Sequence, residues 1–355
     1  MSIFFDAKGR KTNAKRVKKL NEKTFFYEAS DILPGRIRAA VRLAGEKIGG
    51  AIYEIRLYAA SAAVLTTDRG AVYVTDCGGI SGEPERALHP TANEIREAVI
   101  KAAGWSPFAH AEEIKNGYIT FGRGIRAGFG TLCGGEVTVR GITSLNIRIP
   151  CAGTAPRASD AGGVNGLIRG LLIAGEPGSG KTTMLKNITV LLSQSSRRVC
   201  VIDERREFFG REGIFLPPAN VDVISGCDKE TGIMRALRLL SPEFIICDEI
   251  GTESESRAVK ACLNSGVRFI ASIHAGSLCQ LVKRRQFITL FNCDAFDRVV
   301  FLSSGEPGRI VQEYTFTEVK YAILGADNDM PAGFSHGADV HCGGKKESKA
   351  VSCPV

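Results

Sequence analysis

The stretch Leu171-Leu-Ile-Ala-Gly-Glu-Pro-Gly-Ser-Gly-Lys-Thr-Thr183 decides the fold of this chain. It matches the pattern G-x-x-x-x-G-K-[ST] and stands between an apolar run typical of a buried strand and a stretch typical of a helix. Its glycines let the backbone curl so that successive N–H groups converge on a phosphate. The residues predicted to bind a nucleotide are Gly175, Glu176, Pro177, Gly178, Ser179, Gly180, Lys181, Thr182 and Thr183.

Two side chains of this loop indicate which ligands to expect, and we predict ATP and Mg²⁺. Lys181 supplies a positive charge to the β- and γ-phosphates, and the Thr182 hydroxyl is a ligand for Mg²⁺. The helix that begins near Lys181 adds the positive end of its dipole. A dinucleotide-binding G-x-G-x-x-G loop is excluded, because the lysine and the paired threonines have no role in pyrophosphate binding.

A second element, Pro242-Glu-Phe-Ile-Ile-Cys-Asp-Glu249, places two acids after a short apolar strand. Ligands bind at the carboxyl ends of the strands in an open α/β sheet. We therefore predict that Asp248 holds Mg²⁺ through water and that Glu249 polarises the attacking water as a general base. The alternative is that the two acids merely cap the following helix.

Two more strand ends are expected at the same edge. Asp203 and Glu204 follow one apolar run, and Ser272 and His274 close another. Glu204 and His274 are predicted to belong to the catalytic site, and either Ser272 or His274 to sense the γ-phosphate or to position the water. Surface ion pairs for the acids and simple packing for the histidine stay open as alternatives.

The pattern from Leu167 onward predicts an α/β fold with a mostly parallel sheet, because short unalternated apolar runs alternate with helical stretches. The expected strands cover residues 170–174, 198–203, 244–248, 269–273 and 298–302. An extra strand that carries Asp248 and Glu249 indicates a RecA/AAA-like P-loop ATPase with a catalytic glutamate. The absence of an N-K-x-D tetrapeptide disfavours a GTPase, and Glu249 disfavours a kinase of small metabolites.

Five segments differ in composition. Residues 1–24 carry eight Lys or Arg against two acids, which is most of the net charge of +8, and are predicted to be basic and disordered. Residues 25–150 are predicted to form a smaller α+β domain, residues 151–166 a linker, and residues 167–321 the P-loop domain. Residues 322–355 contain few large apolar side chains and are predicted to be a disordered tail.

Within residues 25–150 we expect one or two helices broken at Pro34-Gly35, and a helix over 91–103 that begins at Thr91 with Glu94 three residues later. The expected strands cover residues 51–58, 63–67, 71–75, 117–121, 124–130 and 136–140.

The composition bounds the class of protein. The 355 residues are 44% hydrophobic, and no apolar run approaches the roughly 20 residues that cross a bilayer. The start of the chain lacks the apolar core of a secretory signal, so we expect a cytoplasmic protein. The 11 cysteines include no C-x-x-C pair, which predicts free thiols in a reducing compartment and no zinc site.

Four stretches occur in order along the chain: GEPGSGKTT at 175–183, VIDERREFFG at 201–210, SPEFIICDEIG at 241–251 and ASIHAGS at 271–277. This ordered set resembles the stage III sporulation protein AA family of spore-forming bacteria. More distantly, it resembles the hexameric ATPases that drive type II and type IV secretion and pili. The likeness covers roughly residues 25–320 and departs from the usual pattern at Tyr58, where a basic residue is commoner.

The resemblance implies a mother-cell motor ATPase, a homo-oligomer in the form of a hexameric ring. It would associate peripherally with the outer forespore membrane through membrane proteins of the same operon, in a secretion-like channel complex. It also implies that Asp203, Glu204 and His274 line the nucleotide site. Arginines from a neighbouring domain or subunit would complete the site, and the candidates are Arg123, Arg126, Arg140, Arg148 and Arg238.

The alternative is a nucleic-acid-dependent P-loop ATPase, which the basic residues 1–24 favour slightly. Against it, the body of the chain carries no RNP aromatics and no basic stripe, so nucleic acid is not expected as a partner. A third possibility is a site that binds ATP without hydrolysing it.

Overall fold

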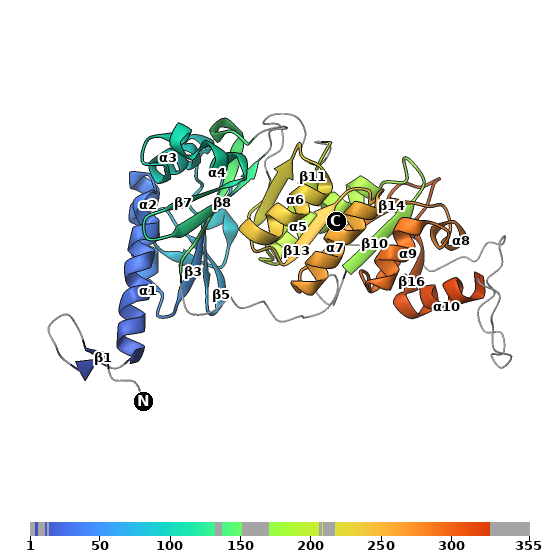
Figure 1. Cartoon of the computed structure of the whole chain (residues 1–355), viewed down its shortest axis with the longest axis horizontal. Coiled ribbons are helices and arrows are strands. Elements are labelled where there is room, and N and C mark those ends of the chain that lie inside the picture. Colours follow the sequence, from blue (N-terminus) through green and yellow to red (C-terminus); the bar gives the residue numbers. More distant parts are fainter. Residues whose placement is uncertain are drawn as a thin grey trace. The chain divides into compact units, whose positions relative to one another are not determined.

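The computed structural model describes residues 4–5, 11–12, 14–131, 137–150, 170–205, 208 and 217–326 (Figure 1). They belong to two compact units. Unit 1 comprises Met1–Gly166 with Ile188–Ile246, and unit 2 comprises Leu167–Asn187 with Cys247–Val355. Residues 188–246, which we placed in the P-loop domain, thus group with the N-terminal residues. The proposed linker and domain boundaries stay predictions, and the whole linker, residues 151–166, lies outside the described residues.

The N-terminal part of unit 1 is a mixture of helices and strands, as expected. Its elements are β1 (Phe4–Phe5), β2 (Lys11–Thr12), α1 (Ala14–Asp31), α2 (Gly35–Lys47), β3 (Ile52–Tyr58), β4 (Val64–Thr67), β5 (Gly70–Val74), β6 (Ile80–Ser81), η1 (Pro84–Arg86), α3 (Ala92–Ala102), η2 (Pro107–His110), α4 (Ala111–Lys115), β7 (Tyr118–Phe121), β8 (Ile125–Thr131), η3 (Val139–Gly141) and β9 (Ile142–Arg148).

The helices of this part follow their sequence signals closely. Helix α1 ends before Pro34 and α2 begins at Gly35, which confirms the predicted break. Thr91 and Glu94 form the reciprocal hydrogen bonds of a capping box at the start of α3. However, α1 begins at Ala14, so residues 14–24 are helical where we expected disorder. Lys, Arg and Glu are good helix formers, and no Pro or Gly interrupts them.

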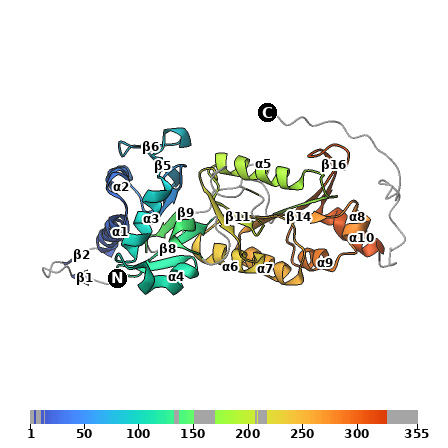
Figure 2. The ribbon, with the colours of Figure 1, turned by 90° about the horizontal axis from the view of Figure 1, so that it is seen from above.

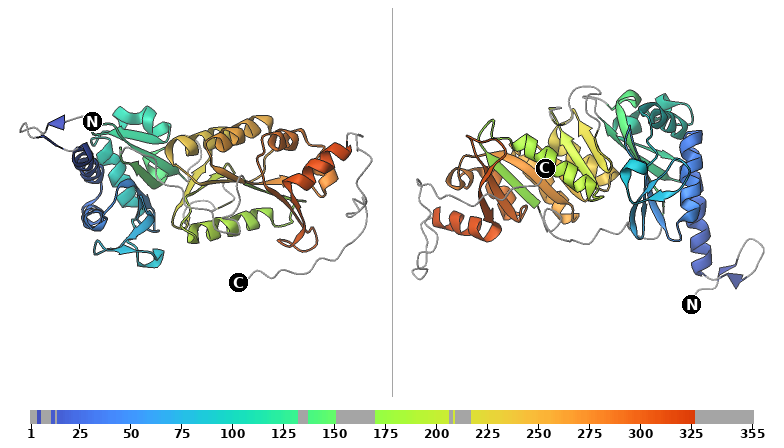
Figure 3. Two further views of the ribbon diagram at one scale, coloured as in Figure 1. Left: turned by 90° about the horizontal axis from the view of Figure 1, so that it is seen from below. Right: turned by 180° about the vertical axis from the view of Figure 1, so that it is seen from behind.

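The strands of unit 1 form a sheet in the order β13-β11-β12-β8-β9-β3-β4-β5-β6, and β7 pairs with β8. β3 pairs antiparallel with both β4 and β9. The predicted strand over 136–140 is wrong, because residues 139–141 form a 3₁₀ turn. The strand in this region is β9, which begins after that turn. Glu136 lies outside the described residues. α1 and α2, the blue helices of Figure 3, lie along this sheet. The main core lies between sheet and helices and includes Leu33, Ile37, Leu57 and Val99.

The later part of unit 1 contains parallel strands. Its elements are β11 (Val199–Asp203), β12 (Val221–Ser225), α6 (Lys229–Leu239) and β13 (Phe244–Cys247). β11 pairs in parallel with β12, and β12 meets β8 in parallel. We expected β11 and β13, but not β12.

A buried ion cluster joins β3 to β12. The Arg56 side chain is only 1% exposed and donates to Glu54 at 3.0 Å, to Asp222 at 3.1 Å and to the Tyr58 hydroxyl at 3.2 Å. It also donates to the Leu240 carbonyl at 2.5 Å. The bonds to Asp222 and Leu240 connect residues more than 160 positions apart and so link residues 188–246 to the N-terminal part of unit 1.

Unit 2 carries the glycine-rich loop. Its elements are β10 (Gly170–Gly175), α5 (Lys181–Gln194, which ends in unit 1), α7 (Glu253–Asn264), β14 (Arg268–His274), α8 (Leu278–Leu281), α9 (Arg285–Asn292), β15 (Arg298–Leu302), β16 (Ile310–Thr315) and α10 (Phe316–Ala326). The strand order is β16-β15-β10-β14.

The sheet of unit 2 is parallel except for its edge. β10 pairs in parallel with β14 and β15, as expected, and β16 is antiparallel to β15. The start of α5 lies on one face of β10 and β14, and α7 and α9 lie on the other (Figure 2). Helix α10 continues to Ala326, so residues 322–326 are helical rather than part of a tail without structure. Residues 327–355 lie outside the described part.

The described residues bear on two expectations that we drew from composition. None of the helices there is both long and apolar enough to cross a membrane. The seven described cysteines are free thiols, as predicted: Cys77, Cys200, Cys227, Cys247, Cys262, Cys279 and Cys293. The other four, Cys133, Cys151, Cys342 and Cys353, lie outside the described residues.

Candidate nucleotide-binding site

The glycine-rich loop runs from the end of β10 at Gly175 to the start of α5 at Lys181. Gly178 and Gly180 have φ values of +79° and +88°, a region that favours glycine, so these two positions explain part of the motif. Residues 176–178 are exposed, whereas Ser179 is buried. Residues 176–178 of the loop are therefore accessible to a ligand from solvent, while Ser179 packs inside the protein.

Lys181 is buried at the centre of this loop. Its Nζ donates to the carbonyl oxygens of Gly175 at 3.0 Å and Glu176 at 2.8 Å, and it lies 3.3 Å from His274 Nδ1. Burial lowers the pKa of Lys181, and the carboxylates of Asp248 and Glu249 partly oppose that shift. The ammonium group is thus held at the start of a helix and beside two acids, where its charge is available to an anion.

Asp248 connects the loop to two other segments. Its Oδ2 accepts a hydrogen bond from the Thr182 hydroxyl at 2.8 Å. Its Oδ1 accepts from the Ser272 hydroxyl at 2.6 Å and from the Glu249 N–H at 3.0 Å. Because β10 and β14 pair with Gly175 opposite His274, their carboxyl ends lie side by side. The parallel register brings Thr182 and Ser272 to the same carboxylate.

Glu249 faces His274. The Glu249 N–H also donates to Ser272 Oγ at 3.0 Å, and Glu249 Oε2 lies 3.5 Å from His274 Nε2. Since the Lys181 ammonium can only donate to Nδ1, the proton of a neutral His274 belongs on Nε2, where it faces the carboxylate. His274 therefore lies between Lys181 and Glu249, and both of their side chains belong to one site.

The helix-capping alternative for the two acids does not describe this structure. Helix α7 has Thr252 as its N-cap, with a side chain that accepts from the Glu255 N–H, and Glu255 in turn accepts from the Thr252 N–H. The capping box thus satisfies two backbone donors at the start of the helix without Asp248 or Glu249. Asp248 and Glu249 precede this cap and direct their carboxylates to the glycine-rich loop and His274.

Several predicted residues belong to unit 1 and have partners there. Glu204 pairs with Lys229 at 3.4 Å, and Asp203 accepts from the Phe208 N–H at 3.1 Å. The arginine candidates also lie in unit 1: Arg123, Arg126, Arg140, Arg148 and Arg238. Their roles at a nucleotide, and that of Glu204, stay predictions.

The residues present fit a magnesium ion that is held mainly by phosphate and water. The Thr182 hydroxyl and the Asp248 carboxylate are hard oxygen donors within 2.8 Å of each other. Among the described residues, no three His, Cys, Asp or Glu side chains gather as a protein-only metal site would require. Mg²⁺ commonly uses one or two protein ligands and completes its shell from phosphate and water, which matches this donor set.

One element of the site that the sequence patterns did not predict is the turn of residues 303–309 between β15 and β16. The Gly308 N–H donates to the Ser179 carbonyl at 2.8 Å, so this turn contacts the glycine-rich loop directly (Figure 2). The signal available in the sequence was the tetrapeptide Gly-Glu-Pro-Gly, which occurs at 175–178 and again at 305–308.

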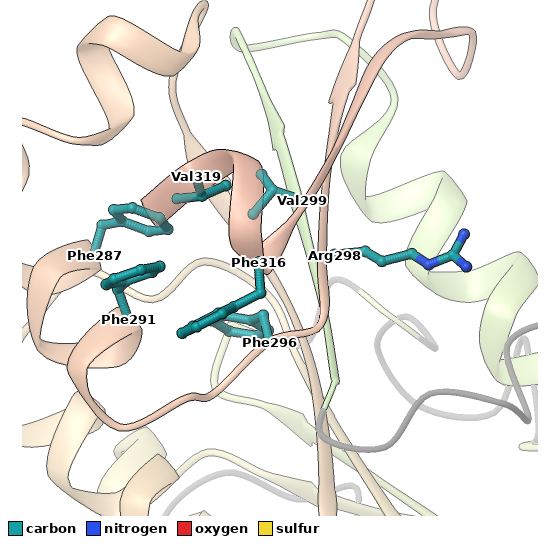
Figure 4. Close-up of a pocket in the computed structure, with 7 residues that line it drawn as sticks. All are labelled: Phe287, Phe291, Phe296, Arg298, Val299, Phe316 and Val319. Carbon is teal, nitrogen blue, oxygen red and sulfur yellow. The ribbon is translucent and has the colours of Figure 1, made fainter. Parts of the chain in front are cut away.

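Unit 2 also contains an apolar pocket away from these polar residues. It is lined by Phe287, Phe291, Phe296, Arg298, Val299, Phe316 and Val319 (Figure 4). The rings of Phe291 and Phe316 stack with centroids 4.6 Å apart, and Arg298 directs its guanidinium away from the phenylalanines. The pocket walls are apolar and offer no group that would act on a substrate.

The fold and the loop together define a P-loop protein of the secretion-ATPase fold. The crystal structure of the VirB11 ATPase from the Brucella suis type IV secretion system matches with a TM-score of 0.51 at 16% identity, over 88% of this chain and 99% of that one. This likeness confirms the predicted fold class.

The chain belongs to the family described as "Sporulation stage III, protein AA", which it matches over residues 30–319. Stage III sporulation protein AA of Bacillus subtilis (strain 168) is 30% identical over 305 residues, which are 81% of this chain and 94% of that protein. The Holliday junction branch migration ATPase PINA of Sulfolobus acidocaldarius is 28% identical over 167 residues, 46% of this chain and 31% of that protein. The predicted family is thus confirmed.

Proposed function

We propose that this chain is an ATPase that hydrolyses ATP with Mg²⁺ and acts as the motor of a secretion-like complex in sporulation. The observation that carries the proposal is the convergence of Lys181, Thr182, Asp248, Glu249 and His274 at one loop, with hydrogen-bonding or ionic distances of 2.8–3.5 Å. A phosphate cradle with its lysine and a residue that activates or positions the attacking water are parts that recur in enzymes of phosphoryl transfer.

In this proposal the chain binds the phosphates, supplies a proton acceptor for the attacking water and orients that acceptor. The N–H groups of the loop and the start of α5 bind the phosphates, and Lys181 places its charge on the terminal ones. Glu249 accepts a proton from the attacking water, and His274 orients the Glu249 carboxylate through Nε2. Ser272 holds the backbone of Glu249, so the carboxylate is oriented before the nucleotide binds.

Thr182 and Asp248 would hold Mg²⁺ in this site. When bound, the ion would neutralise charge that develops on the phosphate oxygens. The Thr182–Asp248 hydrogen bond of 2.8 Å keeps both oxygen donors at the loop.

We further propose that the protein works as a homo-oligomer, in the form of a hexameric ring, on the mother-cell side of the forespore membrane. It would be cytoplasmic and reach the membrane through membrane proteins of the same sporulation operon. Family membership supports this role. Co-purification of those membrane proteins with the full chain from sporulating cells tests it, and their absence from the purified material would count against it.

The chemical step is tested by Glu249→Gln. The general base contributes about 10²–10⁴-fold, so ATP hydrolysis is expected to fall by that factor while ADP affinity is retained. The matched control is Glu253→Gln, which changes an exposed acid in the first turn of α7 and is expected to have no effect. Hydrolysis at the parental rate in Glu249→Gln would show that Glu249 is not the base.

Two further measurements separate the alternatives. An arginine supplied by a neighbouring subunit is worth about 10³–10⁵ in rate, so the rate per subunit is expected to rise with protein concentration. A constant rate would contradict the ring. Stimulation by single-stranded DNA or RNA, with steep salt dependence, would instead favour a nucleic-acid-dependent ATPase.

A further inference from the structure

The turn at residues 303–309 is built against the glycine-rich loop by backbone contacts. The Gly308 N–H donates to the Ser179 carbonyl at 2.8 Å. A methyl group added at Gly180 would lie 2.6 Å from the Gly308 nitrogen, so the two backbones approach as closely as glycine permits. Gly180 and Gly308 both have positive φ values, +88° and +85°. The close approach therefore requires glycine at position 180, whereas glycine at 308 is favoured by its backbone conformation alone, since a methyl group added there would meet nothing within 4 Å.

The turn itself is well ordered by its own hydrogen bonds. The Ser303 hydroxyl accepts from the N–H groups of Gly305 at 3.2 Å and Glu306 at 3.1 Å, and the Ser303 N–H donates to the Arg309 carbonyl at 2.9 Å. β15, from which the turn leaves, pairs directly with β10, from which the glycine-rich loop leaves. Both turns thus leave the carboxyl ends of neighbouring parallel strands, where α/β sheets bind ligands.

Arg309 is the cation of this turn. Its Nη1 donates to both carboxylate oxygens of Glu306, at 2.9 Å and 3.0 Å, and its side chain is 53% exposed. Arg309 directly follows Gly308, so its backbone is one residue from the contact with Ser179. The planar guanidinium of arginine can donate paired hydrogen bonds to the oxygens of a carboxylate or of a phosphate. A phosphate can therefore replace the carboxylate of Glu306.

We propose that Arg309 binds the phosphates of a nucleoside di- or triphosphate held in the glycine-rich loop, and that Glu306 competes for it when no nucleotide is bound. The phosphates would then be bound by two cations: Lys181, which follows β10, and Arg309, which follows β15. Because the turn continues into β16, the exposed edge strand of unit 2, nucleotide binding would restrain that edge as well. The inference rests on the proposed function, since it requires that the loop binds nucleotide.

The test measures binding of a fluorescent ADP to the full chain and to variants of the turn. Arg309→Gln is expected to weaken binding about 10- to 150-fold, the range of a hydrogen bond to a charged group. Glu306→Gln removes the competitor and is expected to tighten binding by up to about fivefold, as for a surface ion pair. The double variant should bind like Arg309→Gln. These opposite signs distinguish phosphate binding from simple disturbance of the turn.

Arg298→Gln is the matched control. Arg298 lies at the other end of the same hairpin, is 57% exposed and pairs with Glu313 at 2.6 Å. Its loss is expected to leave ADP binding unchanged. As a second readout, ADP should slow amide hydrogen exchange over residues 303–309 in the parent chain but not in Arg309→Gln.

The outcomes separate the two proposals. If the parent chain binds ADP and Arg309→Gln binds equally well, or if Glu306→Gln weakens binding as Arg309→Gln does, the inference about Arg309 is wrong while the proposed function stands. If the parent chain does not bind ADP, the proposed function fails and the inference fails with it.

Discussion

Replacement of Arg56 by methionine tests how unit 1 is held together. Arg56 is 1% exposed, and its guanidinium contacts the carboxylates of Glu54 and Asp222, which are themselves 4% and 3% exposed. Methionine keeps the apolar stem and removes the charge. The two carboxylates would then lie buried without their shared cation, and loss of one partner from a buried ion pair costs about 3–5 kcal/mol.

That magnitude depends on burial, and a second arginine of unit 1 provides the comparison. Arg36 also contacts two carboxylates, Asp76 at 3.0 Å and Glu94 at 3.0 Å, but its side chain is 47% exposed. Exposed ion pairs contribute about 0–1 kcal/mol because water solvates each charge when the pair is broken. Arg36→Met is therefore expected to lower the free energy of unfolding by no more than about 1 kcal/mol.

The assay is urea denaturation followed by far-UV circular dichroism, with hydrogen exchange of peptides from β3 and β12 to assign the change to unit 1. At about 2–4 °C per kcal/mol for a unit of this size, Arg56→Met should lower the midpoint of thermal unfolding by about 6–20 °C. Adding Asp222→Asn should recover part of the loss, since Asp222 would otherwise keep a buried charge without the Arg56 cation, whereas Glu54 keeps an ion pair with Arg148 at 3.8 Å.

Equal losses of stability in Arg56→Met and Arg36→Met would contradict a role for burial in this cluster. A further loss, instead of recovery, on adding Asp222→Asn to Arg56→Met would contradict it as well. Either result would mean that the buried charges are solvated or that the cluster contributes through packing alone.

Three further outcomes are expected. Because burial lowers the pKa of Lys181, ADP affinity should fall as the pH rises through the alkaline range, at a lower pH than for an ordinary lysine, and a pH series of ADP titrations checks this. Burial raises the pKa of Cys262 to about 12, so a thiol reagent at neutral pH should modify the exposed Cys77 first and reach Cys262 only after unfolding, as peptide mass analysis would show. Thr91→Ala removes the capping box of α3 and should lower the free energy of unfolding by about 1 kcal/mol in urea titrations.

The polar residues of the site could be predicted because each directly follows an apolar strand. Asp248 comes after β13, His274 ends β14, and Lys181 follows the glycines after β10. Carboxyl ends of parallel strands meet at one edge, so a local pattern was enough to bring these residues together. The same rule also placed Glu204 in the catalytic site, but in the structure Glu204 pairs with Lys229 of α6 at 3.4 Å, and its role at a nucleotide stays a prediction.

Strand β12 was not predicted because a charged residue stands at its second position. Val-Asp-Val-Ile-Ser does not look like a fully buried strand, since Asp222 interrupts the apolar run. Asp222 is tolerated there because Arg56 and Ser144 bind its carboxylate from β3 and β9. A partner that is 166 residues away cannot be read from the neighbouring sequence.

Strand β16 and the turn before it were missed for a different reason. β16 is an edge strand whose residues are almost all exposed, so it shows no alternation of apolar and polar side chains. The turn meets the glycine-rich loop through backbone atoms of Gly308 and Ser179. Backbone contacts between distant segments leave no pattern in side-chain chemistry other than glycine itself.

The backbone conformation of Glu249 supports the chemical role that we propose for this residue. Its φ of +36° lies in a region that costs a residue with a side chain about 1–3 kcal/mol, whereas glycine would adopt it freely. Helix α7 does not require the side chain, since Thr252 caps it. Two acceptors, Asp248 Oδ1 and Ser272 Oγ, hold the Glu249 N–H and so maintain the strained conformation. A general base needs a carboxylate with a fixed orientation, and a strained backbone held by neighbours is one way to obtain it.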